Sequence, residues 1–273
     1  MEAKVVQAFK LAKPDGWDFY TGKTINCRGD SVYPHTVHVP NPNPSLGLCS
    51  AGVIHASVNP NDCFVGAKIP CSAYKVEGNP VCGDKRKYGF TSLVILEEIT
   101  DLDKLFGWRY SEAVKPIHPL RLGKQEPTDI DLLCLLKWAS VWDSVVASVS
   151  DSVWDSVGAS AVASVWASVS DSVWDSVGAS AGASVWASVS DSVSDSVWDS
   201  VVASVSDSVG ASVVAYIGSL FPNIKTWKYT DQKEGLYPYQ SCVDLWKRGF
   251  VPSFDGKIWR LHSGLRATIV WKG

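Results

Sequence analysis

The sequence predicts a mainly β protein: a tetrapeptide-repeat β-solenoid with a β-rich or α+β domain before it and a small cap after it. Three observations lead to this fold class. Residues 140–215 repeat every four positions, residues 1–122 contain many short strand-like segments, and residues 216–273 lose the repeat. Short-period repeats without Pro are typical of solenoids. A long helical repeat tract is the alternative.

The first 122 residues are predicted to form a β-rich or α+β domain. Pro, Gly and Asn clusters separate short segments rich in β-branched and aromatic residues. Many short strands divided by turn signals are typical of a compact domain that contains a sheet. The candidate strands are residues 4–10, 31–39, 52–57, 63–76 and 90–99.

Residues 123–139 are predicted to form a helix that caps the repeat. Thr128 is followed three positions later by Asp131, which is a helix-start pattern, and then by an apolar run that ends at Trp138. An open solenoid end would expose strand edges and apolar side chains. We therefore expect this helix to cover the first coil.

The tract itself, residues 140–215, consists of nineteen tetrads. Ser occupies the first position of every tetrad, and Val occupies the second position in seventeen of them. The third position is mixed and includes six Trp, while the fourth is Asp in nine tetrads and Ala in the others. We expect the two constant positions to be structural and the third to lie at a corner or to point outward.

A single helix is the weaker prediction for this tract. At about 100° per residue, a four-residue step turns the valine stripe by about 40° per tetrad, so no fixed partner covers it. Ser, Val, Trp and Asp also cost roughly 0.5 kcal/mol or more each, relative to Ala, in a helix. A solenoid that stacks each Val on the Val one coil below avoids both problems.

Two resemblances support a repeat protein. The frame Ala163-Ser164-Val165-Trp166 resembles the pentapeptide-repeat unit shortened by one residue, which implies a solenoid whose small and central apolar residues face inward. The small position is Asp in nine tetrads, and an unpaired buried carboxylate is costly. Arrays of S-V-W-[DA] followed by a segment like AYIGSLFPNIKTWKY also resemble uncharacterised proteins of metagenomic and phage origin, which implies no particular activity.

The last segment, residues 216–273, is predicted to be a C-terminal cap or docking module. Residues 241–248 indicate a short helix that stops at Gly249, and residues 254–273 indicate a closing hairpin.

Composition favours a cytoplasmic protein, with association with a virion as an alternative. The chain has no apolar run long enough to span a membrane and no signal-like N-terminus, so we expect no membrane contact. Its seven Cys form no C-x-x-C pair, and an odd number cannot all pair within one chain, so reduced thiols are expected.

Catalytic signals are weak. A zinc site from His35, His38 and neighbouring Cys lacks finger-like spacing, and a Cys nucleophile beside His55 has no support beyond composition. His55 on one strand and Glu98 on a later strand faintly resemble the order in ADP-ribosyltransferase-like folds, but no nucleotide-binding loop accompanies them. We therefore predict no enzyme, no catalytic or metal-binding residue and no cofactor.

The sequence favours a structural or interaction protein whose tract is a rigid spacer and a self-assembly surface, so we expect a homo-oligomer. The alternative is an acidic mimic of nucleic acid: the tract carries nine Asp and no Lys, Arg or Glu, so a basic protein partner, such as a DNA-processing enzyme, would bind it rather than nucleic acid itself. The predicted surface consists of Trp142, Trp154, Trp166, Trp174, Trp186, Trp198, Asp143, Asp155, Asp175 and Asp199.

Overall fold

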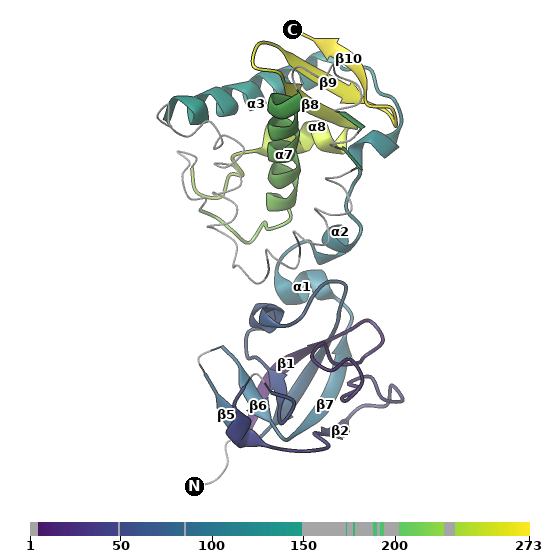
Figure 1. Ribbon diagram of the computed structural model, residues 1–273, viewed down its shortest axis with the longest axis vertical. Coiled ribbons are helices and arrows are strands. Elements are labelled where there is room, and N and C mark those ends of the chain that lie inside the picture. Colours follow the sequence, from purple (N-terminus) through teal and green to yellow (C-terminus); the bar gives the residue numbers. More distant parts are fainter. Residues whose placement is uncertain are drawn as a thin grey trace. The chain divides into compact units, whose positions relative to one another are not determined.

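The computed structural model describes residues 5–48, 50–84, 86–148, 202–226 and 233–273, together with positions 173, 177, 188, 189, 192 and 193. The chain divides into two compact units, Met1–Tyr110 and Ser111–Gly273. Among the described residues, all the sheets are small and antiparallel, and none lies in the repeat tract (Figure 1).

The first unit contains two sheets around one core. The larger sheet has the order β1-β4-β7-β2 and the smaller has the order β3-β6-β5. The core is formed by side chains such as Tyr74, Val76, Phe90, Leu93 and Ile95, all of which are fully buried. The strands are β1 Val6–Ala12, β2 His35–His38, β3 Ile54–Ala56, β4 Ser72–Gly78, β5 Cys82–Gly83, β6 Tyr88–Phe90 and β7 Ser92–Ile99.

Short helical turns complete the first unit: η1 Pro44–Leu46, η2 Pro60–Val65 and α1 Leu102–Phe106. The helix α1 begins where the Asp101 side chain accepts a hydrogen bond from the Lys104 backbone. It ends at Gly107, whose φ of 74° is the left-handed conformation that glycine adopts without strain. The residue that follows, Trp108, stacks on Phe106 with 5.4 Å between ring centroids.

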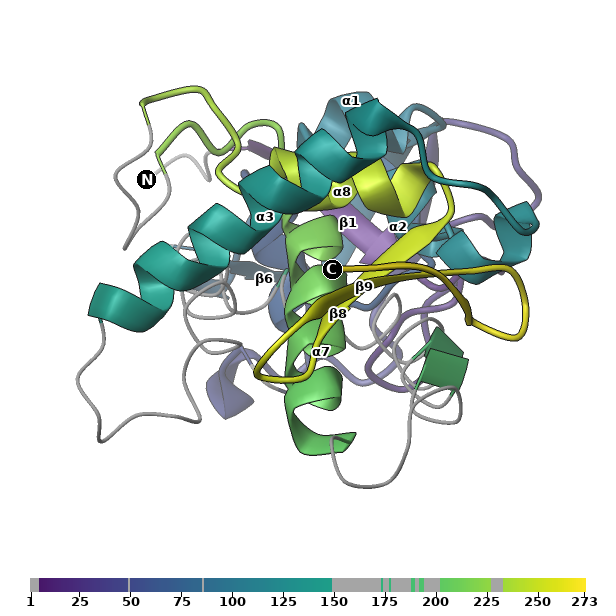
Figure 2. The ribbon, with the colours of Figure 1, turned by 90° about the horizontal axis from the view of Figure 1, so that it is seen from above.

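The second unit places helices against a three-stranded meander of order β10-β9-β8. The helix α8 packs against both α3 and α7, and α7 also packs against β8 (Figure 2). The hairpin predicted for residues 254–273 is present as β9 and β10, and β8 adds a third antiparallel strand to it. The elements are α2 Tyr110–Val114, η3 Pro119–Leu122, α3 Asp129–Ser148, α7 Val202–Gly218, α8 Gln240–Lys247, β8 Phe250–Phe254, β9 Trp259–Ser263 and β10 Thr268–Lys272.

The start of α3 is held by a buried carboxylate. The backbone N–H and the hydroxyl of Thr128 both donate to Asp131, at 2.8 and 2.7 Å. The guanidinium of Arg248, just after α8, pairs with the same carboxylate at 2.7 Å. This arrangement caps the first turn and ties α3 to α8. The helix then runs without a break from residue 129 into the repeat as far as residue 148.

The predicted β-solenoid is wrong for the part of the tract that the structure describes. Residues 140–148 belong to α3, and residues 202–215 belong to α7. The six other described positions of the tract are also helical. A mainly β fold class is therefore replaced by separate small sheets with helices that extend into both ends of the repeat.

Burial explains why the propensity argument failed. Every side chain of α7 and its C-terminal extension from Ser208 to Phe221 is buried, and a helix that is apolar all round suits such a site. Where other elements surround the helix, valines on every face can be buried, so a stripe that turns by about 40° per tetrad does not destabilise it. Burying one valine side chain stabilises by about 1.5 kcal/mol or more, which exceeds the propensity cost of roughly 0.5 kcal/mol.

Candidate functional site

The predicted interaction surface falls mostly outside the described residues. Trp142 and Asp143 lie on the described backbone of α3, but their side chains are outside what the structure describes. The other eight lie outside the described residues altogether: Trp154, Trp166, Trp174, Trp186, Trp198, Asp155, Asp175 and Asp199. The Trp surface and the acidic surface therefore stay predictions.

Most of the second-position valines that the structure describes are buried. One described second-position valine, Val141, is half-buried. Six others have at most 3% of their surface exposed. These are Val173, Val177, Val189, Val193, Val209 and Val213.

Serines at the first position of the tetrad can donate a hydrogen bond to a backbone carbonyl of their own helix. Ser192 donates to the backbone carbonyl of Ser188 at 2.7 Å, and Ser212 donates to that of Ser208 at 2.9 Å. A serine hydroxyl in a helix can bond the carbonyl four residues earlier, and the repeat places another Ser there. The four-residue period therefore lets buried serines close their hydrogen bonds within one helix.

The fourth position differs between its two residue types in α7. Asp207 is exposed, whereas Ala211 and Ala215 are buried. At this described tetrad the carboxylate is directed to solvent, so it carries no desolvation cost of the kind that counted against the sequence prediction.

The residues of the enzyme hypothesis do not share a cavity. Glu98 on β7 pairs with Arg28 at 3.0 Å and accepts a hydrogen bond from the Tyr33 hydroxyl at 3.3 Å. His55 on β3 instead lines a cavity of about 190 Å³ whose walls do not include Glu98. These partners make Glu98 part of a structural polar cluster at the end of the larger sheet.

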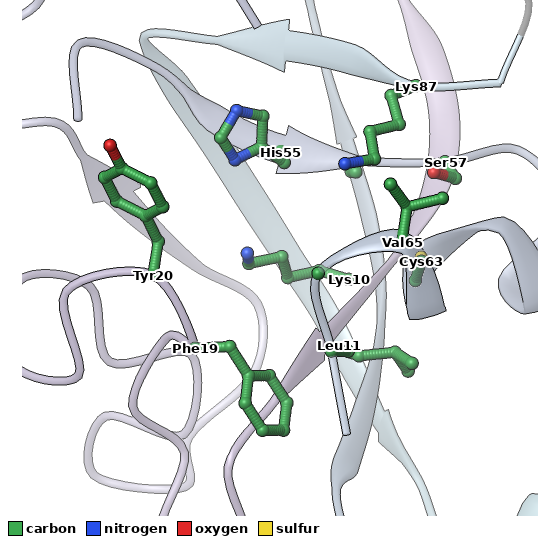
Figure 3. Close-up of a pocket in the computed structure, with 12 residues that line it drawn as sticks. Lys10, Leu11, Phe19, Tyr20, His55, Ser57, Cys63, Val65 and Lys87 are labelled. Atoms are coloured by element: carbon green, nitrogen blue, oxygen red, sulfur yellow. The ribbon is translucent and has the colours of Figure 1, made fainter. Parts of the chain in front are cut away.

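This cavity is built from five segments of the first unit (Figure 3). The strand β1 contributes Lys10 and Leu11, and the loop after it contributes Phe19 and Tyr20. The remaining walls come from β3, from η2 with the residues after it, and from the approach to β6. They are His55, Ala56, Ser57, Cys63, Val65, Gly66, Ala67 and Lys87. The sequence prediction included His55 but missed Lys10 and Lys87.

His55 is a neutral ring at this site. Its Nε2 lies within hydrogen-bonding distance of the Leu48 carbonyl, and a carbonyl can only accept, so Nε2 carries the proton. Burial lowers the pKa of His55, and the charges of Lys10 and Lys87 lower it further. At neutral pH the ring therefore presents Nδ1 as an acceptor.

Five of the described cysteines have a raised pKa and are therefore protonated thiols: Cys27, Cys63, Cys71, Cys134 and Cys242. Burial raises the pKa of Cys63, which lines the cavity, and raises that of Cys27 to about 11. A thiol with a raised pKa holds little thiolate at neutral pH. Cys49 lies outside the described residues. Within the described part of the chain, no three His, Cys, Asp or Glu side chains gather as metal ligands would.

A serine and a histidine form a second pair that sequence reasoning missed. The Ser253 hydroxyl lies 2.7 Å from Nε2 of His262, and Nδ1 of His262 lies 2.9 Å from the Ala267 carbonyl. This is the tautomer that a serine nucleophile and its base require. Both side chains have 0% of their surface exposed, so no substrate reaches the hydroxyl. The pair holds the turn between β9 and β10.

No protein-family model matches this chain, and no curated protein and no solved structure is significantly similar to it. Within the described residues, none of the helices combines the length and the hydropathy that crossing a bilayer requires. The resemblance to tandem tetrapeptide-repeat proteins therefore stays a prediction.

Proposed function

We propose that this chain is a non-catalytic structural and interaction protein whose repeat tract builds part of the second unit and presents a surface for self-assembly. The observation that carries the proposal is the use of the two constant positions. Six described second-position valines are buried, and described serines such as Ser192 and Ser212 bond their own helix. The first two positions of the tetrad thus serve packing. In α7 the third-position residue Val214 is buried as well, so the proposal assigns contacts with partners to the tetrads that carry Trp.

The packing of both ends of the tract within the second unit supports a structural role. The helices α3 and α7, which contain the first and last tetrads, both pack against α8. The first and last tetrads therefore both pack within the second unit. Its Trp residues, six in nineteen tetrads, are suited to an apolar contact between copies, because aromatic side chains dominate such interfaces.

The experiment is to change all six tract Trp to Ser and to measure the molar mass of the full chain by light scattering. The wild type is expected to be a homo-oligomer and the variant a monomer. The matched control changes the third-position serines, residues 150, 170, 190, 194 and 206, to Ala, and this control should keep the wild-type mass. Equal masses for the Trp variant and the wild type would contradict the self-assembly surface.

The acidic alternative is favoured by one observation, the exposure of Asp207. If fourth-position Asp residues face solvent throughout the tract, their field attracts a basic protein partner. Changing the nine Asp to Asn should then abolish salt-sensitive binding to a basic nucleic-acid enzyme. Binding that persists in high salt, or in the Asn variant, would contradict this alternative.

A further inference from the structure

Lys10, which lines the cavity of the first unit, lies at a position of β1 that faces the hydrophobic core. Along β1, side chains alternate between faces, so Ala8, Lys10 and Ala12 share one face. Ala8 and Ala12 belong to the hydrophobic core, yet Lys10 between them is only 9% exposed. A buried lysine is rare unless it is paired, because burying its charge is costly. Its position therefore requires an explanation.

Asp18 is the carboxylate that interacts electrostatically with Lys10, but it is already hydrogen-bonded to its own loop. The Asp18 side chain accepts four hydrogen bonds from the loop that follows it, from the backbone of Thr21, Thr24 and Ile25 and from the Thr21 hydroxyl. These bonds fold the loop that carries Phe19 and Tyr20 over the cavity. Asp18 thus shapes the wall, and the ammonium of Lys10 remains directed into the space.

A second lysine faces the same space. Lys87 lies just before β6, and Figure 3 shows its ammonium directed toward the His55 ring, while the Lys10 ammonium lies on the side of that ring that faces Tyr20 and Phe19. Both charges act on the His55 ring. The cavity lining contains no Asp or Glu. Its walls therefore carry two positive charges, a neutral imidazole and apolar side chains.

We propose that this cavity binds a compact phosphate monoester, with the phosphate between Lys10 and Lys87 and the organic group against Phe19, Tyr20 and Val65. Charge and size select this class. A phosphate monoester carries about −1.5 to −2 at neutral pH, which matches two ammonium groups, whereas a carboxylate neutralises only one. The volume, 190 Å³, corresponds to the share of about six waters and admits a small organic phosphate but not a dinucleotide.

The first test is calorimetric titration of the full-length chain with phenyl phosphate in a phosphate-free buffer. One site per chain is expected. Lys10→Met and Lys87→Met should each weaken binding by about tenfold or more, because each removes a charge-assisted bond. The matched control, Lys23→Met, removes an exposed lysine outside the cavity and should leave affinity unchanged. Benzoate should bind at least about tenfold more weakly than phenyl phosphate.

Several outcomes would overturn the proposal. These are the absence of binding at millimolar phenyl phosphate, an equal loss of affinity in the Lys23 and Lys87 variants, or equal affinity for benzoate. Lys87 precedes β6 and is only half-buried, so its variant tests the site even if Lys10→Met fails to fold. A phosphotyrosine peptide that binds more tightly than phenyl phosphate would overturn the assignment to a free small molecule.

The second test locates the bound anion. A phosphate between the two lysines offsets the charges that lower the pKa of His55, so binding should raise that pKa in an NMR titration of the imidazole signals. In Lys87→Met the ligand-induced rise should be smaller. An imidazole signal of His55 that does not change when phenyl phosphate saturates the protein would place the ligand elsewhere and contradict the proposal.

Discussion

The two units bury polar groups in opposite ways. In α7 of the second unit, the Ser212 hydroxyl donates to the carbonyl of Ser208 in its own helix and is also hydrogen-bonded to the Cys242 side chain of α8, so its burial is satisfied within the protein. In the first unit, Lys10 is buried on the core face of β1 and directs its charge into a cavity. A buried polar group that is satisfied internally serves the fold. One that is left facing a cavity is available to a ligand.

The largest expected change in the free energy of unfolding concerns His262, a buried side chain whose two ring nitrogens both make hydrogen bonds within the second unit. Burial lowers its pKa from 6.5 to about 4. The unfolded chain therefore binds the proton more readily, and the stability of the second unit is lost as pH falls from about 6.5 to 4. The loss should approach about 3 kcal/mol. Hydrogen exchange followed by mass spectrometry, read separately for the two units, measures it.

The variant His262→Gln isolates this contribution because glutamine does not titrate. Whatever its stability at pH 7, its second unit should lose about 3 kcal/mol less than the wild type between pH 6.5 and 4. Equal losses in the two proteins would show that His262 is not buried in its neutral form.

The next effect contrasts two buried charges. Arg248→Met leaves the buried carboxylate of Asp131 without its cation and should destabilise the second unit by about 2 kcal/mol. Lys10→Met removes a charge that has no dedicated partner, so the first unit should keep its stability or gain up to about 1 kcal/mol. The same exchange measurement reports both values. A loss of more than about 1 kcal/mol for Lys10→Met would assign that lysine to the fold.

Much of the first unit could be predicted from local patterns. Segments 31–39, 52–57 and 90–99 contain β2, β3 and β7, because alternating apolar residues and turn clusters are local signals. Segment 63–76 was predicted as one strand, yet its start belongs to η2 and only its end to β4. Pro60 at the helix start and the Asn59 side chain, which accepts a bond from Asn61, were the missed signals.

The repeat and the cavity could not be read from the sequence for a different reason. Helix propensity is a local quantity, whereas the burial of α7 depends on β8 and α8, which follow it in the chain. The cavity likewise combines β1 with loops more than forty residues away. One signal was present: Lys10, the last residue of the predicted strand 4–10, stands between Ala8 and Ala12 at alternate positions, so an extended chain places all three on the same face.

The smallest effect separates two serines of the same helix. Ser208→Ala should destabilise the second unit by about 1 kcal/mol, because the Ser208 hydroxyl accepts a hydrogen bond of 2.9 Å from the Phe254 backbone at the end of β8. Ser212→Ala should cost less, about 0.5 kcal/mol, because it loses a bond within its own helix and a weak bond with the Cys242 thiol, and the higher helix propensity of Ala offsets part of this loss. Both residues occupy the first position of a tetrad and are fully buried, so each is the control for the other. Denaturant unfolding of the two variants measures the difference. Equal costs would mean that the self-bonded serines of the repeat do more than satisfy their own hydroxyls.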